Sequence, residues 1–457
     1  MKNAYRPLFL TILILGSTSC LLASSQPADS TAGIIDKASA ILLIEDGRTL
    51  FSEGKTRSAL TKFREASNKD PYSWKALYWI SKCHYLLDNY GYALKYATYA
   101  KEAEKDNVDG EVYLILGIAH HRLGNLDTAL VNYTLALEKM KKRRAKETNV
   151  QQYIDECAFA MEALKKGPTL SKSRVPGINS GFDDYNVVIL GEGKSMLFTS
   201  RRNNTTGGGM NPDDERYFED TYKATFDHEL GEWSNITNEL GKVNSSGFDA
   251  VNYVSPDNLT AIITLNNTAT GDKNKTRGSD ICEMKRNNKG SWNRPQPIDN
   301  NTINTSFFEG SATLTDDGNT MYFVTDRKGD KSSTDIYVVE KVGKSWGKAK
   351  PLPKSINTEG RETTPFITPD GRFLFFSSDG HLGMGGLDIY VVENKGGSWG
   401  KPINLGAGIN TVTNDSHFVY SEKLKKAFVC GYEIVGNKAS LDIYEIDVTH
   451  FEIPTEK

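Results

Sequence analysis

The sequence predicts a two-domain protein, α-helical in its first part and all-β in its second. Residues 39–166 carry few strand signals, and their apolar residues follow the spacing of amphipathic helices. Residues 168–450 instead contain a strand-rich unit that recurs five times. With 457 residues, of which 38% are hydrophobic, the chain is long enough to build a separate core for each part.

The β-rich repeat is clearest between residues 356 and 390. Two strands are predicted on either side of Pro369-Asp370-Gly371, a turn in which proline fixes φ and glycine can take a positive φ. A loop and a third strand from Asp388 follow. Two markers keep this order in every copy: an Ile/Val-Asn pair (Asn179, Asn244, Asn304, Asn357, Asn410) and Asp-x-Tyr/Cys (Asp220, Asp280, Asp335, Asp388, Asp442). Five such units of about four strands predict a five-bladed β-propeller.

The ends of the repeat region predict how the ring closes. The fifth copy lacks a fourth strand, and residues 172–179 before the first copy match that missing strand. We therefore expect this leading segment to complete the last blade. Closure of this kind removes an exposed sheet edge, which would otherwise invite aggregation.

The helical part contains three units that resemble tetratricopeptide repeats, a family of stacked helix pairs. The residues at the family's positions are Gly47, Ala59, Phe63, Ala66 and Pro71 in the first unit, Leu77, Ile80, Ala93 and Ala100 in the second, and Tyr113, Leu116, Gly117, Ala129, Tyr133 and Ala136 in the third. The second unit departs from the pattern, with Ser81 in place of glycine and Lys105 in place of proline. Residues 147–166 then suit a capping helix, which such stacks need.

The resemblance implies a concave face on the first helix of each pair. The matching positions are Arg48, Phe51, Lys75, Tyr78, Lys82, Tyr85, Glu111 and His121. Such residues commonly form a groove for an extended peptide. The alternative is that the three units serve only as a spacer or pack against the propeller.

The N-terminus has the features of a secretory signal over residues 1–25, followed by a linker at 26–38. Lys2 and Arg6 precede an apolar run at residues 8–15, which is too short to span a membrane. Ser17-Thr18-Ser19-Cys20 resembles a bacterial lipobox, with Ser17 in place of the usual leucine, and Ala23-Ser24-Ser25 would suit ordinary cleavage. Both readings place the mature protein outside the cytoplasm, and lipidation of Cys20 would anchor it to the outer membrane.

One acidic residue recurs five positions after each repeat asparagine: Asp184, Asp249, Glu309, Glu362 and Asp415. Because the first strand of each blade lines the channel of a propeller, these carboxylates could form a ring that binds Ca²⁺ or a basic segment. The alternative is structural, with each carboxylate accepting hydrogen bonds from its own turn or the next blade.

Other sequence features speak against catalysis. The chain has no His-Glu-x-x-His or Cys-x-x-Cys motif, and its two Gly-x-Ser-x-Gly matches fall at hairpin positions of the repeat. We therefore assign no catalytic residue, no metal ligand and no required cofactor. A net charge of −3 argues against nucleic acid as a partner.

The blade motif, Ser/Thr-Pro-Asp-Gly, an apolar strand and Asp-Ile-Tyr, resembles the PD40 or TolB-type (WD40-like) propeller repeat. The order of domains is similar to the N-terminal portion of Bacteroidota envelope lipoproteins of the OmpA family, some of them associated with type IX secretion. Those relatives often continue into a peptidoglycan-binding domain, which residues 451–457, a short tail, do not supply; direct binding to peptidoglycan is therefore not expected.

This resemblance implies a non-catalytic periplasmic scaffold that binds other envelope proteins. The alternative is a glycan-binding or glycan-cleaving module that uses the acidic residues at the channel mouth. Aromatic residues such as Phe308, Trp346 and Trp399 would then lie beside them.

Overall fold

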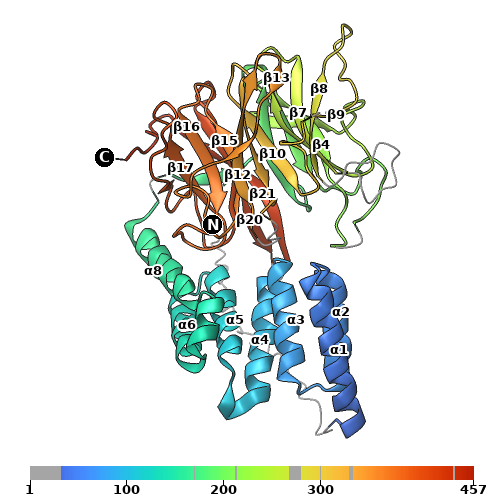
Figure 1. Ribbon diagram of the computed structural model, residues 1–457, viewed down its shortest axis with the longest axis vertical. Helices are drawn as coiled ribbons and strands as arrows, with labels where there is room; N and C mark the ends of the chain where they lie inside the picture. The colour runs from blue at the N-terminus through green and yellow to red at the C-terminus, as the bar shows by residue number, and fades with distance from the viewer. Residues whose placement is uncertain are drawn as a thin grey trace, which may run out of the picture.

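A computed structural model describes residues 32–168, 170–211, 214–266, 279–298, 300–328, 333–435 and 438–456. It confirms the predicted order of an α-helical domain followed by a five-bladed propeller, and the propeller lies across one end of the helices (Figure 1). The predicted signal segment, with Cys20, lies outside the described residues. Among those described, no helix is both long and apolar enough to cross a bilayer.

The helical domain contains the three predicted helix pairs. They are α1 (Ile34–Ser52) with α2 (Thr56–Lys69), α3 (Trp74–Leu86) with α4 (Tyr90–Glu104), and α5 (Gly110–Arg122) with α6 (Leu126–Lys139). Helix α1 begins inside the predicted linker, because residues 34–38 are already helical. The helix predicted over residues 147–166 is α8 (Val150–Lys166). A short helix that was not predicted, α7 (Lys142–Glu147), precedes it, and Asn149, in a left-handed conformation with φ of 50°, separates the two.

Small residues let the paired helices approach closely. A β-carbon at Gly47 would overlap the ring of Phe63, and one at Gly117 would overlap the ring of Tyr133. Ser81, the departure from the pattern, is tolerated because its hydroxyl donates a hydrogen bond of 2.7 Å to the carbonyl oxygen of Ala93. In the first and third pairs the aromatic ring therefore fills the space that the missing side chain leaves.

The propeller has five antiparallel sheets. Blade 1 contains β2 (Asp184–Leu190), β3 (Ser195–Ser200), β4 (Asp220–Asp227) and β5 (Glu232–Thr237). Blade 2 contains β6 (Phe248–Val254), β7 (Thr260–Asn266), β8 (Asp280–Lys285) and β9 (Gln296–Pro297). Blade 3 contains β10 (Glu309–Leu314), β11 (Thr320–Thr325), β12 (Asp335–Val342), β13 (Ser345–Trp346) and β14 (Lys350–Pro351). Blade 4 contains β15 (Glu362–Ile367), β16 (Phe373–Ser378), β17 (Asp388–Glu393) and β18 (Ile403–Asn404).

The fifth blade confirms the predicted closure. It contains β19 (Asp415–Ser421), β20 (Lys426–Val435) and β21 (Lys438–Asp447), and β1 (Lys172–Arg174) pairs antiparallel with β21 as its fourth strand. The strand is shorter than the predicted segment 172–179. An ion pair of 2.6 Å between Arg174 and the buried Asp442 reinforces the joint.

The repeat asparagines explain the register of the blades. Each side chain bonds both the amide and the carbonyl of one residue on the third strand of the preceding blade, at 2.7 to 3.0 Å. The pairs are Asn179 with Ile443, Asn244 with Thr221, Asn304 with Ile281, Asn357 with Ile336, and Asn410 with Ile389. These five contacts, which we call the asparagine clips, join every blade to its neighbour and also span the closure joint.

The innermost strands β2, β6, β10, β15 and β19 surround the central channel. Each contains a register shift, and four residues at these bulges have positive φ: Asn186, Ser311, Thr364 and His417. A bulge turns its extra side chain away from the normal alternation. Ser311, Thr364 and His417 line cavities on both sides of the propeller, so they form the waist of the channel.

The helical domain is fastened to blades 4 and 5. Met384, in the loop before β17, is fully buried in the same core as Leu126 and Tyr133. Arg122 donates a 3.0 Å hydrogen bond to the carbonyl of Val412, and Tyr432 donates one of 2.9 Å to Asp88. These contacts combine a shared apolar core with directed hydrogen bonds, so they fix how the two domains face each other.

Candidate binding site

The five recurring carboxylates are buried and serve their own turns. All five side chains are 0% exposed. In each blade the carboxylate accepts hydrogen bonds of 2.5 to 2.8 Å from the amide and the hydroxyl of the residue four positions earlier: Ser180 to Asp184, Ser245 to Asp249, Thr305 to Glu309, Thr358 to Glu362, and Thr411 to Asp415. The arrangement matches the structural alternative that the sequence left open.

Basic residues neutralise three of these carboxylates. Arg202 approaches Asp184 to 3.1 Å, Arg327 approaches Glu309 to 3.3 Å, and Lys172 approaches Asp415 to 2.5 Å. Burial raises the pKa of Asp249 to about 7. None of the five lines either cavity that opens on the channel, and the described residues contain no group of three His, Cys, Asp or Glu arranged to hold a metal ion.

Most of the predicted concave-face residues do meet, on α1, α3 and α5. Tyr78 donates a 2.6 Å hydrogen bond to Glu111, and Arg144 donates another of 2.6 Å to the other oxygen of that carboxylate. Burial alone would raise the pKa of Glu111, but the hydrogen bonds from Arg144 and Tyr78 outweigh it and lower the pKa. Glu111 is thus a fixed anion that orients one wall of the groove.

Lys82 is surrounded by aromatic rings on this face. Its ammonium lies 4.8 Å from the ring centre of Trp79 and 5.5 Å from those of Phe51 and Tyr78. The guanidinium of Arg48 lies 5.8 Å from the same Trp79 ring. We call Arg48, Phe51, Tyr78, Trp79, Lys82, Glu111 and Arg144 the helical groove.

Lys82 lacks a carboxylate partner among the described residues, which makes this groove suited to an anion. Burial lowers the pKa of Lys82, since the charged form loses hydration. No described carboxylate lies within ion-pair distance of its ammonium; Glu111, which favours the charged form, is taken up by Tyr78 and Arg144. A partner carboxylate would therefore give Lys82 the counter-ion that the groove does not supply.

His121 was predicted for this concave face, and that placement is wrong. It is 0% exposed, and its Nε2 lies 2.9 Å from the carbonyl oxygen of Met384 while its Nδ1 lies 3.2 Å from the hydroxyl of Tyr133. Burial lowers the pKa of His121 to about 3. The neutral ring can donate to the carbonyl and accept from the tyrosine, so His121 belongs to the contact between the domains.

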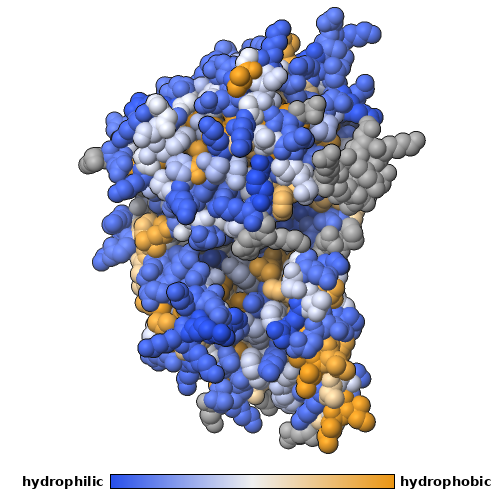
Figure 2. All heavy atoms as spheres, viewed as in Figure 1, coloured by the Kyte–Doolittle hydropathy of each residue, from blue (hydrophilic) through white to orange (hydrophobic). Residues whose placement is uncertain are grey.

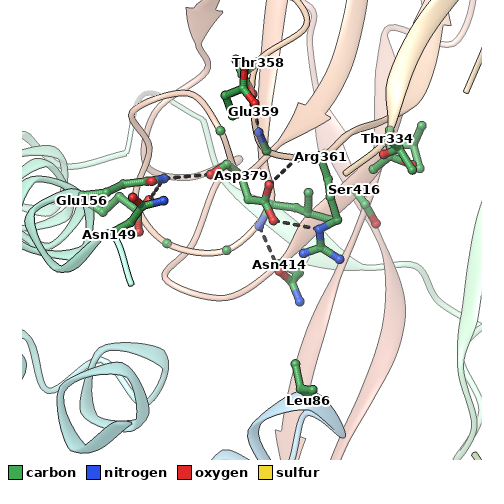
Figure 3. A pocket seen from close by; sticks show the side chains of 18 of the residues that line it. Leu86, Asn149, Glu156, Thr334, Thr358, Glu359, Arg361, Asp379, Asn414 and Ser416 are labelled. Carbon is green, nitrogen blue, oxygen red and sulfur yellow. Dashed lines mark hydrogen bonds and ion pairs between the residues drawn. The ribbon is translucent and has the colours of Figure 1, made fainter. Parts of the chain in front are cut away.

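A cavity, which we call the interdomain cavity, lies between the helices and the propeller (Figure 3). Its volume is about 1380 Å³. Helices α3, α7 and α8 contribute Tyr85, Leu86, Glu147, Gln152 and Glu156, and the loops of blades 3 and 4 contribute Lys328, Lys354, Glu359, Arg361 and Asp379. Arg361 pairs with Asp379 at 2.8 Å, and burial raises the pKa of Glu156 to about 7. Tyr85, predicted for the concave face, lines this cavity.

The first turns of α1 expose an apolar surface. Ile34, Ile35, Ile41 and Leu42 are 89%, 81%, 62% and 69% exposed. Figure 2 shows apolar side chains gathered over this end of the helical domain. The spacing places these four residues along one side of α1.

The sequence reasoning missed three residues of these sites. Trp79 supplies the ring nearest Lys82, Arg144 orients Glu111, and Met384 joins the domains. Arg144 lies in a basic run that reads as a solvated helix end, so nothing local marked it. Met384 stands among glycines in the loop at 380–386, and an apolar side chain in such a glycine-rich loop was a usable signal.

No protein-family model matches the chain, and no curated protein matches it. Solved structures similar to it include the first TPR domain of Spaghetti (RPAP3) bound to an HSP90 peptide, at 20% identity and a TM-score of 0.26, covering 28% of this chain and 98% of that one. The Yersinia enterocolitica type III secretion chaperone SycD, in complex with a peptide of the translocator YopD, is 20% identical with a TM-score of 0.26, covering 29% of this chain and 99% of that one. YrrB, described as a TPR protein with an unusual peptide-binding site, is 21% identical with a TM-score of 0.24, and the match covers 30% of this chain and 70% of YrrB.

Proposed function

We propose that the protein is a non-catalytic scaffold that binds a partner protein through the helical groove. The observation that carries this proposal is Lys82, held among three aromatic rings beside an anion that is already neutralised. Stacked helix pairs of this kind typically present an extended concave binding surface. The partner segment that fits is acidic, with a carboxylate to meet Lys82 and apolar groups for the rings.

The burial of the five recurring carboxylates supports a scaffold over the glycan-active alternative. Glycoside hydrolysis needs two carboxyl groups facing an open site about 5–10 Å apart. In this propeller each carboxylate is enclosed and accepts hydrogen bonds from a backbone amide. We therefore propose no activity for the channel mouth.

Charge reversal in the groove should abolish partner binding. A benzophenone residue placed at the exposed Lys75 serves as the photo-crosslinker in intact cells. We expect Lys82→Glu to reduce crosslinking to the partner by at least about tenfold, because a partner carboxylate would meet a like charge. The matched control is Lys95→Glu, an exposed lysine on α4, which should crosslink as the unchanged protein does. A discrete adduct that survives Lys82→Glu, or a protein that never crosslinks, would remove the proposal.

We further propose that the protein works in the periplasm, anchored to the outer membrane through Cys20, in an envelope assembly of the kind associated with type IX secretion. The support is the N-terminal signal pattern and the resemblance in domain order. A lipid on Cys20 would be followed by only a short segment before the exposed apolar turns of α1.

Removing the modified thiol tests the anchor. We expect Cys20→Ser to abolish incorporation of an alkynyl fatty acid and to move the protein from the membrane fraction to the soluble fraction of lysed cells. Cys83→Ser is the matched control, because Cys83 is buried and unpaired inside the helical domain. Equal labelling of the Cys20→Ser and unchanged proteins would contradict lipidation at this residue.

A further inference from the structure

The helical groove and the lining of the interdomain cavity are connected by a series of side-chain contacts. Tyr78 bonds Glu111, Glu111 bonds Arg144, and Arg144 lies 3.6 Å from Glu147, which lines the cavity. On α3, Tyr85 lies two turns beyond Tyr78 on the same side and also lines the cavity. These contacts place residues of the helical groove next to the lining of the interdomain cavity.

The cavity is larger than a small molecule requires. At about 1380 Å³ it exceeds the roughly 300–1,000 Å³ that is typical of small-ligand pockets. Its lining is mixed, since it includes the exposed Lys354 and Glu359, the buried Glu156 and the ion pair of Arg361 with Asp379. A polar hollow with both signs of charge suits the backbone and side chains of a polypeptide better than an apolar ligand.

We infer that one extended segment of the partner protein occupies both sites, with its acidic part in the helical groove and its continuation in the interdomain cavity against the loops of blades 3 and 4. This inference rests on the proposed function and adds the propeller as a second binding surface for the same segment. Tyr78 to Tyr85 spans about 10 Å of helix, whereas a fifteen-residue extended segment reaches about 50 Å. The segment is therefore long enough to fill the groove and enter the cavity.

Two residues on the cavity wall can be changed without touching the core. Lys354 is exposed and has no ion-pair partner in the described part of the chain, and Leu86 is 51% exposed at the end of α3. Lys354→Glu reverses a charge on the propeller side, and Leu86→Trp fills space on the helical side. The matched control is Lys348→Glu, an exposed lysine of the same blade that does not line the cavity.

The probe is a fifteen-residue peptide that is selected from a random phage library for binding to the full-length protein and labelled with fluorescein. The two halves of this peptide are labelled and tested separately. By fluorescence anisotropy we expect Lys354→Glu and Leu86→Trp each to weaken the whole peptide at least about tenfold while leaving its groove-binding half unchanged. A benzophenone at the end of the other half should crosslink to residues 354–361. Lys348→Glu should change neither affinity.

The outcomes separate the two proposals. If Lys82→Glu abolishes binding but both cavity variants bind the whole peptide normally, the groove function stands and the shared site is overturned. If Lys82→Glu has no effect, or no peptide is selected, both proposals fall. Loss of the whole peptide together with its groove-binding half in the cavity variants would indicate a disturbed fold, and it too would overturn the shared site.

Discussion

Met384→Ala should lower the free energy of unfolding by about 3 kcal/mol, because a buried methionine leaves a cavity when it is truncated. Met384 is 0% exposed and packs with the buried Leu126 and Tyr133 of the helical domain, although it belongs to a propeller loop. Its carbonyl oxygen accepts from His121 at 2.9 Å, and this backbone contact is retained in the variant. The loss therefore reports the side chain alone, and urea unfolding measures it.

Met384→Asp should go further and separate the two domains. A carboxylate at this position would be desolvated without a partner, and burial of an unpaired charge costs several kcal/mol. We expect the radius of gyration from small-angle X-ray scattering to increase while the far-ultraviolet circular dichroism stays nearly unchanged. Leu382→Asp is the control, since Leu382 lies in the same loop but is 52% exposed. If Met384→Ala unfolds within about 0.5 kcal/mol of the unchanged protein, Met384 does not fasten the domains.

The architecture could be predicted because it repeats along the chain. Five copies of Asn and Asp markers fixed the number of blades, and the unpaired segment before the first copy fixed the closure that β1 makes with β21. Five of the seven groove residues followed from the resemblance of the helical units to tetratricopeptide repeats, and Trp79 and Arg144 did not. In each case the information lies in local spacing, which the sequence displays directly.

The contact between the domains could not be predicted, because its residues are far apart in the chain and each occurs once. His121 and Met384 are separated by 263 positions, and the resemblance to tetratricopeptide repeats placed His121 on the open concave face. Packing of the propeller against that end of α5 decides otherwise. The sequence pattern that the repeats share cannot identify a contact that only one of the repeats makes.

The role of the recurring carboxylates was available in the sequence but was left open. A serine or threonine follows every repeat asparagine: Ser180, Ser245, Thr305, Thr358 and Thr411. Short hydroxyl side chains at this position favour a local turn, and the hydroxyl and backbone amide of that turn can donate hydrogen bonds to a carboxylate that follows in the chain. A hydroxyl residue directly after each repeat asparagine, together with an acidic residue four positions later, would have favoured the structural role over a metal or glycan site.

We expect the asparagine clips to contribute strongly to the free energy of unfolding. Asn357 is 6% exposed and makes three hydrogen bonds: it accepts from the amide of Ile336 at 2.9 Å and donates to the carbonyls of Ile336 and Leu352 at 3.0 and 3.1 Å. The backbone groups that it serves lie at the joint between blades 3 and 4, where water does not replace them. Their loss should cost more than an exposed hydrogen bond does.

We therefore expect Asn357→Ala to lower the free energy of unfolding by about 3 kcal/mol, at roughly 1 kcal/mol for each lost hydrogen bond. Asn293→Ala, an exposed asparagine whose side chain makes no described hydrogen bond, is the control and should change it by less than about 0.5 kcal/mol. The same substitution at Asn179 acts at the joint that β1 closes and removes two hydrogen bonds, so it should lower the free energy of unfolding by about 2 kcal/mol. A protein in which Asn357→Ala and Asn293→Ala unfold alike would show that blade packing alone sets the ring, and that the clips specify register without adding stability.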